Sequence, residues 1–357
     1  MDKPDKKFET SRRDTMRLAV IAAGALAAPA CAAADTGSKA GAAAASAGNA
    51  PPFKVKLDFA DPIWNRDTYA RVDGELDFSK QKVSRITGKV YGVRDNEVVR
   101  PLFAMDGFSV VRTMQLPDGN WRRLLKEIVF YRDLESGKIM QQWQNPYTNE
   151  KVKVVPIAND PFNYDIRDTV PKGPSYGGLN DAERKPDPFL LDWTDIGDKL
   201  LFNTGIDLFY PASLQPAQWP RESAGSWNRV SEHFQFGMEK ADVLNPSVTA
   251  IPVTGSWSRL TPWLPWMLMG QAKGCTNYFT HFYTVKDGIA GLPQDLVDAA
   301  KAIDPGYLTA PTEDYGPSLS SLENYKKTEK PAPVPAGWTA PAEPSPPPLP
   351  SFMKRPK

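Results

Sequence analysis

The sequence contains few of the side chains on which metal and redox chemistry depend. Among its 357 residues there are two histidines, His233 and His281, and two cysteines, Cys31 and Cys275. This count excludes multi-histidine metal centres, zinc ribbons, iron–sulfur clusters and disulfide scaffolds. The glycine-rich motifs that bind dinucleotides or nucleotide phosphates and the paired-histidine motif of zinc proteases are also absent. We therefore expect no metal and no cofactor.

An excess of charge of either sign is lacking as well. The 43 basic and 42 acidic residues leave a net charge of +1, which gives no indication of a nucleic-acid partner. Proline, in contrast, is abundant, with 35 residues where a usual share of about 5% would give half that number. Because proline interrupts helices, this density argues against a mainly helical fold.

The amino terminus is typical of an export signal. Arg12 and Arg13 precede a short, weakly apolar stretch and small residues that suit cleavage near 32–34. Residues 1–34 thus resemble a twin-arginine signal, which predicts the twin-arginine export machinery as a partner and a periplasmic or secreted location. The apolar stretch is too short to span a bilayer, so no transmembrane segment is expected in the mature chain. Lipid anchoring at Cys31 is a less favoured alternative.

Composition divides the rest of the chain into three parts. Two thirds of residues 35–52 are Ala, Gly or Ser, and this segment is predicted to be a flexible spacer. Residues 53–330 are predicted to form a single β-rich domain. Residues 331–357 hold ten prolines and are predicted to be a disordered, extended tail, from which Trp338 could still dock on the domain.

Turn sequences at short intervals predict antiparallel β structure. Four turn signals between residues 83 and 158 leave no room for crossover helices; they are 94–97, 117–120, 135–138 and 146–149. Further strands are predicted at 199–205, 207–211, 227–238, 250–258 and 275–285. We expect a mainly β fold, an antiparallel meander closing into a lipocalin-like or similar barrel, with a short C-terminal helix at 293–302.

The strand register follows if the last three of these turns are four-residue loops. The predicted pairs are Leu116 with Trp121, Leu134 with Ile139 and Asn145 with Glu150. The face predicted to be the interior carries Val111, Leu124, Lys126, Ile128, Phe130, Ile139, Trp143, Val152 and Val154. The other face is polar at one end, with Arg123 and Glu127 as an outer ion network, and its apolar end is expected to lie under the helix at 293–302.

Several short motifs together resemble a known family. They are Gly107-Phe108-Ser109-Val110, Phe130-Tyr131-Arg132-Asp133, Trp143 with Asn145-Pro146-Tyr147-Thr148, Ser256-Trp257-Ser258-Arg259 and Pro262-Trp263-Leu264-Pro265-Trp266-Met267. As a set they resemble a bacterial family of exported proteins known as domain of unknown function 1838, over roughly residues 55–327. The resemblance agrees with an export signal and implies no reaction and no catalytic residues.

Two side chains are candidates for general acid–base catalysis inside such a barrel. His281 lies in a strand-like run, and Glu232 shares a strand face with Val230, Phe234 and Phe236, neighbours that would raise the pKa of a buried carboxyl group. Simpler interpretations make His281 a hydrogen-bonded strand residue and Glu232 an edge residue that reaches solvent.

Five side chains are candidates for ligand contacts. Lys126 would bind an anion if it faced the interior, although its ammonium could instead reach water at the barrel mouth. Trp263 and Trp266 belong to a proline-containing loop that would serve as a lid, as a partner surface, or as a plug at one end of the barrel. Trp143 and Tyr278 would add aromatic lining.

These features favour a binding protein for an apolar or amphipathic small molecule held in a β-barrel pocket. One alternative is a cofactor-independent isomerase, hydratase or lyase that uses His281 or Glu232. This alternative requires a converging polar cluster in an enclosed pocket, and exposure of both histidines would contradict it. A second alternative is a cell-envelope interaction protein that engages its partner through the tryptophan-rich loop or the tail.

Overall fold

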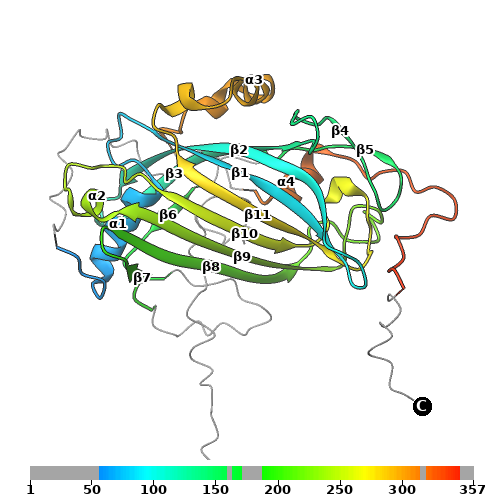
Figure 1. Ribbon diagram of the computed structural model, residues 1–357, viewed down its shortest axis with the longest axis horizontal. Helices are drawn as coiled ribbons and strands as arrows, with labels where there is room; N and C mark the ends of the chain where they lie inside the picture. The colour runs from blue at the N-terminus through cyan, green and yellow to red at the C-terminus, as the bar shows by residue number, and fades with distance from the viewer. Residues whose placement is uncertain (1–55, 159–162, 171–186, 314–318, 346–357) are drawn as a thin grey trace, which may run out of the picture.

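A computed structural model describes residues 56–158, 163–170, 187–313 and 319–345. Its main feature is a nine-stranded antiparallel sheet with the order β6-β3-β2-β1-β11-β10-β9-β8-β7 (Figure 1). The strands are β1 (Lys82–Val93), β2 (Arg100–Gln115), β3 (Trp121–Arg132), β6 (Tyr164–Ile166), β7 (Asp192–Asp195), β8 (Lys199–Pro211), β9 (Trp227–Glu239), β10 (Thr254–Thr261) and β11 (Cys275–Thr284). A separate hairpin pairs β4 (Gln142–Gln144) with β5 (Lys151–Lys153). The mainly β, antiparallel prediction is confirmed.

The sheet curls into a half-barrel and does not close, because β6 and β7 form its two edges in the described part of the chain. The prediction of a closed barrel is therefore corrected to a curled open sheet. The hydroxyl groups of Tyr131 in β3 and Tyr278 in β11, which are three positions apart in the sheet order, lie 3.3 Å from each other on the concave side.

The concave face holds the main core. Against it pack α1 (Pro62–Asp73), α2 (Lys240–Leu244), the short helix η1 (Pro265–Met267) and α4 (Ser321–Thr328). The helix α1 begins where the Asp61 side chain accepts a hydrogen bond from the Ile63 N–H at 2.9 Å, with Pro62 in the first helical position. It buries Trp64 and Tyr69 against the sheet.

The convex face of β1, β2 and β3 is covered by a second layer. This layer consists of α3 (Gln294–Ile303) with the short helices η2 (Gly288–Gly291) and η3 (Pro305–Leu308). Leu296 and Ala300 of α3 are fully buried in a cluster that includes Phe108 and Val110. The predicted C-terminal helix is confirmed, and it covers an apolar part of the sheet, as expected.

The register of β2 and β3 differs by one residue from the prediction. Gln115, not Leu116, pairs with Trp121, because Leu116 joins a longer loop in which Gly119 has a φ of 82°. The two faces of β3 are therefore exchanged: Arg123 and Glu127 are buried on the concave face. In β3, four residues predicted to be interior instead lie on the convex side; they are Leu124, Lys126, Ile128 and Phe130. Trp143, Val152 and Val154 lie in the main core, as predicted.

The next two turns give one correction and one confirmation. Ile139 forms an isolated bridge with Arg132 rather than pairing with Leu134. In the β4–β5 hairpin, the Asn145 N–H donates to the Glu150 carbonyl at 2.8 Å, as the predicted pair requires.

Residues 331–345 lie against the domain without regular secondary structure. The Arg221 guanidinium lies 5.4 Å from the ring centre of Trp338, and the Lys273 ammonium lies 2.8 Å from the Glu343 carboxylate. The prediction of a disordered tail is wrong for these residues, and the docking of Trp338 is confirmed.

The predicted signal at 1–34, with Arg12, Arg13 and Cys31, and the spacer at 35–52 lie outside the described residues. Within the described ranges, no helix combines the length and the apolar character that a membrane crossing needs.

Candidate functional site

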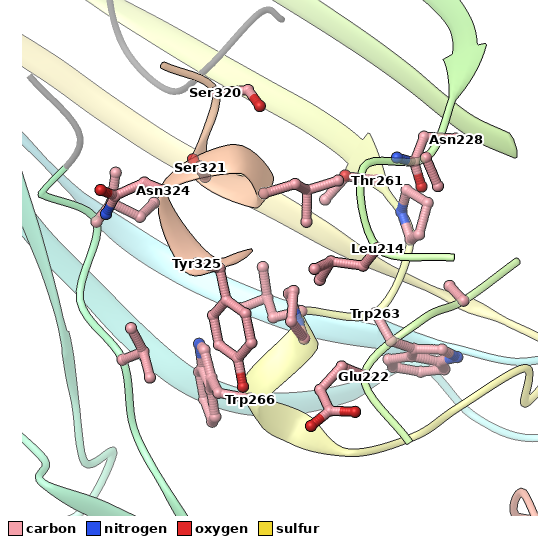
Figure 2. A pocket seen from close by; sticks show the side chains of 18 of the residues that line it. Leu214, Glu222, Asn228, Thr261, Trp263, Trp266, Ser320, Ser321, Asn324 and Tyr325 are labelled. Carbon is pink, nitrogen blue, oxygen red and sulfur yellow. The ribbon is translucent and has the colours of Figure 1, made fainter. Parts of the chain in front are cut away.

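A cavity lies between the concave face of the sheet and the segments that cover it (Figure 2). Its floor consists of strand side chains from β3, β8, β9, β10 and β11, namely Tyr131, Tyr210, Asn228, Arg259, Thr261 and Tyr278. Its walls are residues 155–157, parts of the loop 212–224, the η1 segment and α4. The space between the surrounding atoms amounts to about 890 Å³, a figure that includes open solvent.

The helix α4 forms one wall, and its position is set at its first turn. The Ser320 hydroxyl accepts from the Glu323 N–H, and the Glu323 carboxylate accepts from the Ser320 N–H, at 3.1 and 2.8 Å. In Figure 2 the Tyr325 side chain points from this helix toward Trp266 and Glu222. The Tyr325 ring also packs edge-on against Trp219, with ring centres 5.9 Å apart.

The tryptophan-rich loop forms the opposite wall. Trp263 and Trp266 are 3% and 4% exposed, so this loop fills the end of the half-barrel as a plug rather than presenting a partner surface. The loop is fixed from outside by the β4–β5 hairpin, where the Asn145 amide donates to the Met267 carbonyl at 2.7 Å. Trp143 is buried behind Trp266, at 5.7 Å between ring centres, and does not itself line the cavity.

Three lining residues present polar atoms that have no hydrogen-bond partner within the described ranges. These atoms are Asn228 Nδ2, Glu222 Oε2 and Ser321 Oγ, and each is screened from solvent. The other carboxylate oxygen of Glu222 accepts from the Ala332 N–H at 2.5 Å. A buried polar atom without a partner costs about 1 to 3 kcal/mol, so the cavity is prepared to receive polar groups.

Beneath the cavity floor lies an ion pair. Glu232 is 2% exposed; its Oε1 lies 3.5 Å from Arg259 Nε, and its Oε2 accepts from the Trp257 indole N–H at 3.1 Å. Burial raises the pKa of Glu232 to about 7, against the opposing effects of Arg259 and Trp257. The predicted pKa increase for a buried Glu232 is therefore confirmed, although the carboxylate reaches the cavity only through Arg259, which lines it.

The phenols of the floor are proton donors at neutral pH. Burial raises the pKa of Tyr278 to about 12 and raises the pKa of Tyr131 and Tyr210 above the usual range. Tyr278, a predicted ligand contact, therefore lines the cavity as a neutral hydroxyl.

The predicted histidine and lysine lie elsewhere. His281 and His233 are exposed, on the convex side of β11 and β9. The interior placement of His281 is corrected, because Tyr278 and Thr280 alternate inward in this strand. Lys126 also lies on the convex side, where its ammonium donates to the Gly306 carbonyl at 3.1 Å, so it does not contact the cavity.

One further sequence pattern concerns nucleophilic catalysis. Gly173-Pro174-Ser175-Tyr176-Gly177 has the Gly-x-Ser-x-Gly spacing of a hydrolase nucleophile turn, and it lies outside the described residues. A serine nucleophile of this type needs a histidine base. Both histidines lie on the exposed convex face.

A second cavity lies deeper on the concave face, beside the carboxyl end of α1. Its polar lining is an internally paired group in which the Arg123 Nε lies 2.7 Å from the Asp73 carboxylate. The Tyr164 hydroxyl donates to the same carboxylate at 2.5 Å. This pairing serves the packing of α1 on β3.

Arg259, Asn228 and α4 belong to the site but were not predicted from the sequence. The serine–glutamate spacing at Ser320 and Glu323 could have revealed the start of α4, since it matches a capping box. Arg259 gave no local signal, because its importance depends on its cross-strand partner Glu232.

A family model described as Protein of unknown function (DUF1838) matches residues 79–329, which include every strand of the sheet and all of α4. A search of curated proteins finds no match.

Proposed function

Because the chain belongs to the DUF1838 family, whose description names no activity, we propose from the cavity alone that it binds an amphipathic small molecule. The proposed mode is lipocalin-like, with the ligand held against the concave face of the curled sheet. The observation that carries the proposal is the combination of aromatic walls with three buried polar atoms that lack partners. A ligand with an apolar body and a few polar atoms would satisfy both.

The test is recovery and exclusion of the ligand. Native mass spectrometry of the purified full chain should show a bound small molecule that organic extraction releases. Ala224→Trp would fill the cavity from its wall and should abolish this mass difference while leaving the circular dichroism spectrum unchanged. Ala302→Trp, at the exposed end of α3, is the matched control and should retain the ligand. Wild-type protein without any ligand, and without affinity for added amphiphiles, would contradict the proposal.

A cofactor-independent enzyme is less well supported. Its histidine is exposed on the convex face, and Glu232 is not among the residues that line the cavity. The interaction-protein alternative loses its presented tryptophan loop, since both tryptophans are buried.

We propose export by the twin-arginine route on the pattern of residues 1–34 alone. Substituting Arg12→Lys and Arg13→Lys together should retain the protein in the cytoplasm of a bacterial host with that route. Cell fractionation of wild type and variant measures the effect, and unchanged localisation would contradict export by this route.

A further inference from the structure

The cavity wall carries a buried carboxylate that forms no ion pair in the part of the chain that the structure describes. Glu222 is the one acidic residue among the described residues that line the cavity, and it is 3% exposed. Its Oε1 accepts from the Ala332 N–H at 2.5 Å, and its Oε2 has no hydrogen-bond partner among those residues. A carboxylate removed from water needs donors on both oxygens and a nearby positive charge. Here only the Ala332 donor is present.

The arginines closest to this wall are paired with other carboxylates. Arg221, which precedes Glu222 in the chain, lies 2.5 Å from the Glu150 carboxylate and does not line the cavity. Arg259 does line it, and its Nε lies 3.5 Å from Oε1 of Glu232 beneath the floor. The charges of the floor therefore balance each other, and the negative charge on the wall is left without compensation.

Aromatic side chains lie next to this carboxylate. In Figure 2 Glu222 is drawn with Trp263 on one side and with Trp266 and Tyr325 on the other. The three aromatic residues line the cavity, and each is 8% exposed or less. Burial first, and the Glu222 charge second, raise the pKa of the Tyr325 phenol, as expected of groups that lie close together. Aromatic ring faces attract cations, so rings beside a carboxylate favour a positive group.

The missing contact requires both a hydrogen-bond donor and a positive charge. A neutral hydroxyl group would donate to Oε2 and leave the charge uncompensated. A hard metal ion takes about six to eight oxygen ligands, and the described residues contain no group of three or more His, Cys, Asp or Glu side chains that could hold one. A protonated amine supplies the donor and the charge together, in a charge-assisted hydrogen bond.

We propose that the ligand of the cavity is an amphipathic amine, whose protonated nitrogen donates to Glu222 Oε2 beside the aromatic rings of the wall. Its apolar body lies against the apolar lining, which includes Leu214 and Leu264. This inference rests on the proposed binding function and specifies its ligand class.

Three ligands with one aromatic body test the charge separately from binding itself. Phenylbutylamine, phenylbutanol and phenylbutyrate differ in a single terminal group, which is cationic, neutral or anionic at pH 7. Isothermal titration calorimetry of the full chain should give a dissociation constant at least about tenfold lower for the amine than for the alcohol, and the acid should bind most weakly. This comparison uses the wild type and does not depend on the folding of a variant.

Variants assign the preference to Glu222. Glu222→Gln keeps an oxygen for the Ala332 N–H and removes the charge, so it should bind the amine and the alcohol with equal affinity. Glu222→Asp, whose shorter side chain withdraws the carboxylate, should give an intermediate preference and serves if the glutamine variant does not fold. Glu239→Gln, which removes an exposed carboxylate of β9, is the matched control and should behave as wild type.

Each outcome decides a different statement. Equal affinity of the wild type for amine and alcohol, or an amine preference that survives in Glu222→Gln, would overturn the amine proposal and leave cavity binding intact. A copurified ligand that lacks a basic nitrogen would overturn it too. Ala224→Trp should lose both ligands, and unchanged binding there would show that they bind outside the cavity. A wild type that binds none of the three, and carries no molecule in its native mass spectrum, would contradict the binding function itself.

Discussion

Glu232 is a carboxyl group whose proton affinity links the cavity floor to the stability of the fold. Its pKa rises from 4.5 to about 7 on folding, because burial disfavours the charged carboxylate more than Arg259 and the Trp257 indole favour it. A raised carboxyl pKa means that the folded protein binds a proton which the unfolded chain releases. Between about pH 4.5 and pH 7 the contribution of this group to stability therefore falls as pH rises.

The substitution Glu232→Gln should remove this pH dependence. Between pH 5 and pH 8 the wild type should lose about 2 kcal/mol of unfolding free energy through this group that the variant does not lose. Urea denaturation at pH 5, 6, 7 and 8 gives the comparison. Glu239→Gln, exposed on the same strand, should follow the wild type, and parallel curves for wild type and Glu232→Gln would show that the carboxyl is ionised throughout.

Of the ion pair between Glu232 and Arg259, only Glu232 was predicted from the sequence. The alternation of Glu232 with Val230, Phe234 and Phe236 indicates a carboxylate on an apolar strand face, and the structure buries it there. Arg259 could not be foretold in the same way. Its role depends on the pairing of β9 with β10, which places it directly opposite Glu232.

The helix α4 is held in place by few contacts, although it forms a wall of the cavity. It is an eight-residue helix that supplies a cavity wall, and its first turn depends on the reciprocal bonds between Ser320 and Glu323. So short a helix has little stability of its own, and the cap and the Tyr325 contacts maintain it.

Ser320→Ala should loosen α4 without unfolding the sheet. Loss of the cap costs about 1 kcal/mol, which corresponds to about fivefold faster hydrogen exchange in α4. Exchange measured by mass spectrometry should show this increase in peptides that cover α4, with β9 and β10 unchanged. Ser247→Ala, at an exposed position, is the control; equal exchange of α4 in both variants would show that the capping box does not hold the helix.

The register predicted for β2 and β3 was wrong because both faces of β3 are covered by other parts of the protein. Alternation reveals an inner face only where the other face meets water. In β3 the convex side packs under α3 through Ile128 and Phe130, and the concave side buries Leu125 and Val129. With both faces apolar, only the loop length could fix the register. The β4–β5 hairpin, whose Gln142, Gln144, Lys151 and Lys153 face outward, was predicted correctly because its faces differ.

On the scale of the whole molecule, the C-terminal segment fastens parts that are distant in the chain. Residues 331–345 contact the β1–β2 turn through Arg94, the loop 212–224 through Arg221, and Gly270 through the Trp338 ring. The carbonyl of Pro333 accepts from Arg221 at 3.0 Å. The high proline content favours this extended path, since it restricts the backbone before docking.

Trp338→Ala should therefore destabilise the protein, although Trp338 lies outside the sheet. Loss of the contact with Arg221 and with Gly270 should lower the unfolding free energy by about 1 kcal/mol, with the secondary structure retained. Thermal unfolding of the full chain measures the change. Val334→Ala, half-exposed in the same segment, should leave it unaltered; an unchanged Tm for Trp338→Ala would show that the docked segment adds no stability.

The pairing of β1 with β11 also determines when the cavity comes into existence. This one seam joins the group β6-β3-β2-β1 to the group β11-β10-β9-β8-β7, and its partners, such as Thr87 and His281, lie far apart in the chain. Tyr131 comes from the first group and Arg259 from the second, so neither group alone contains the floor. Long-range pairing of this kind forms slowly, and it must wait until β11 has been synthesised. A ligand that contacts both groups would stabilise the pairing of β1 with β11, because it binds the folded chain and not the unfolded one. The proposed twin-arginine route carries proteins that are already folded, so loading of the ligand and completion of folding would both precede export.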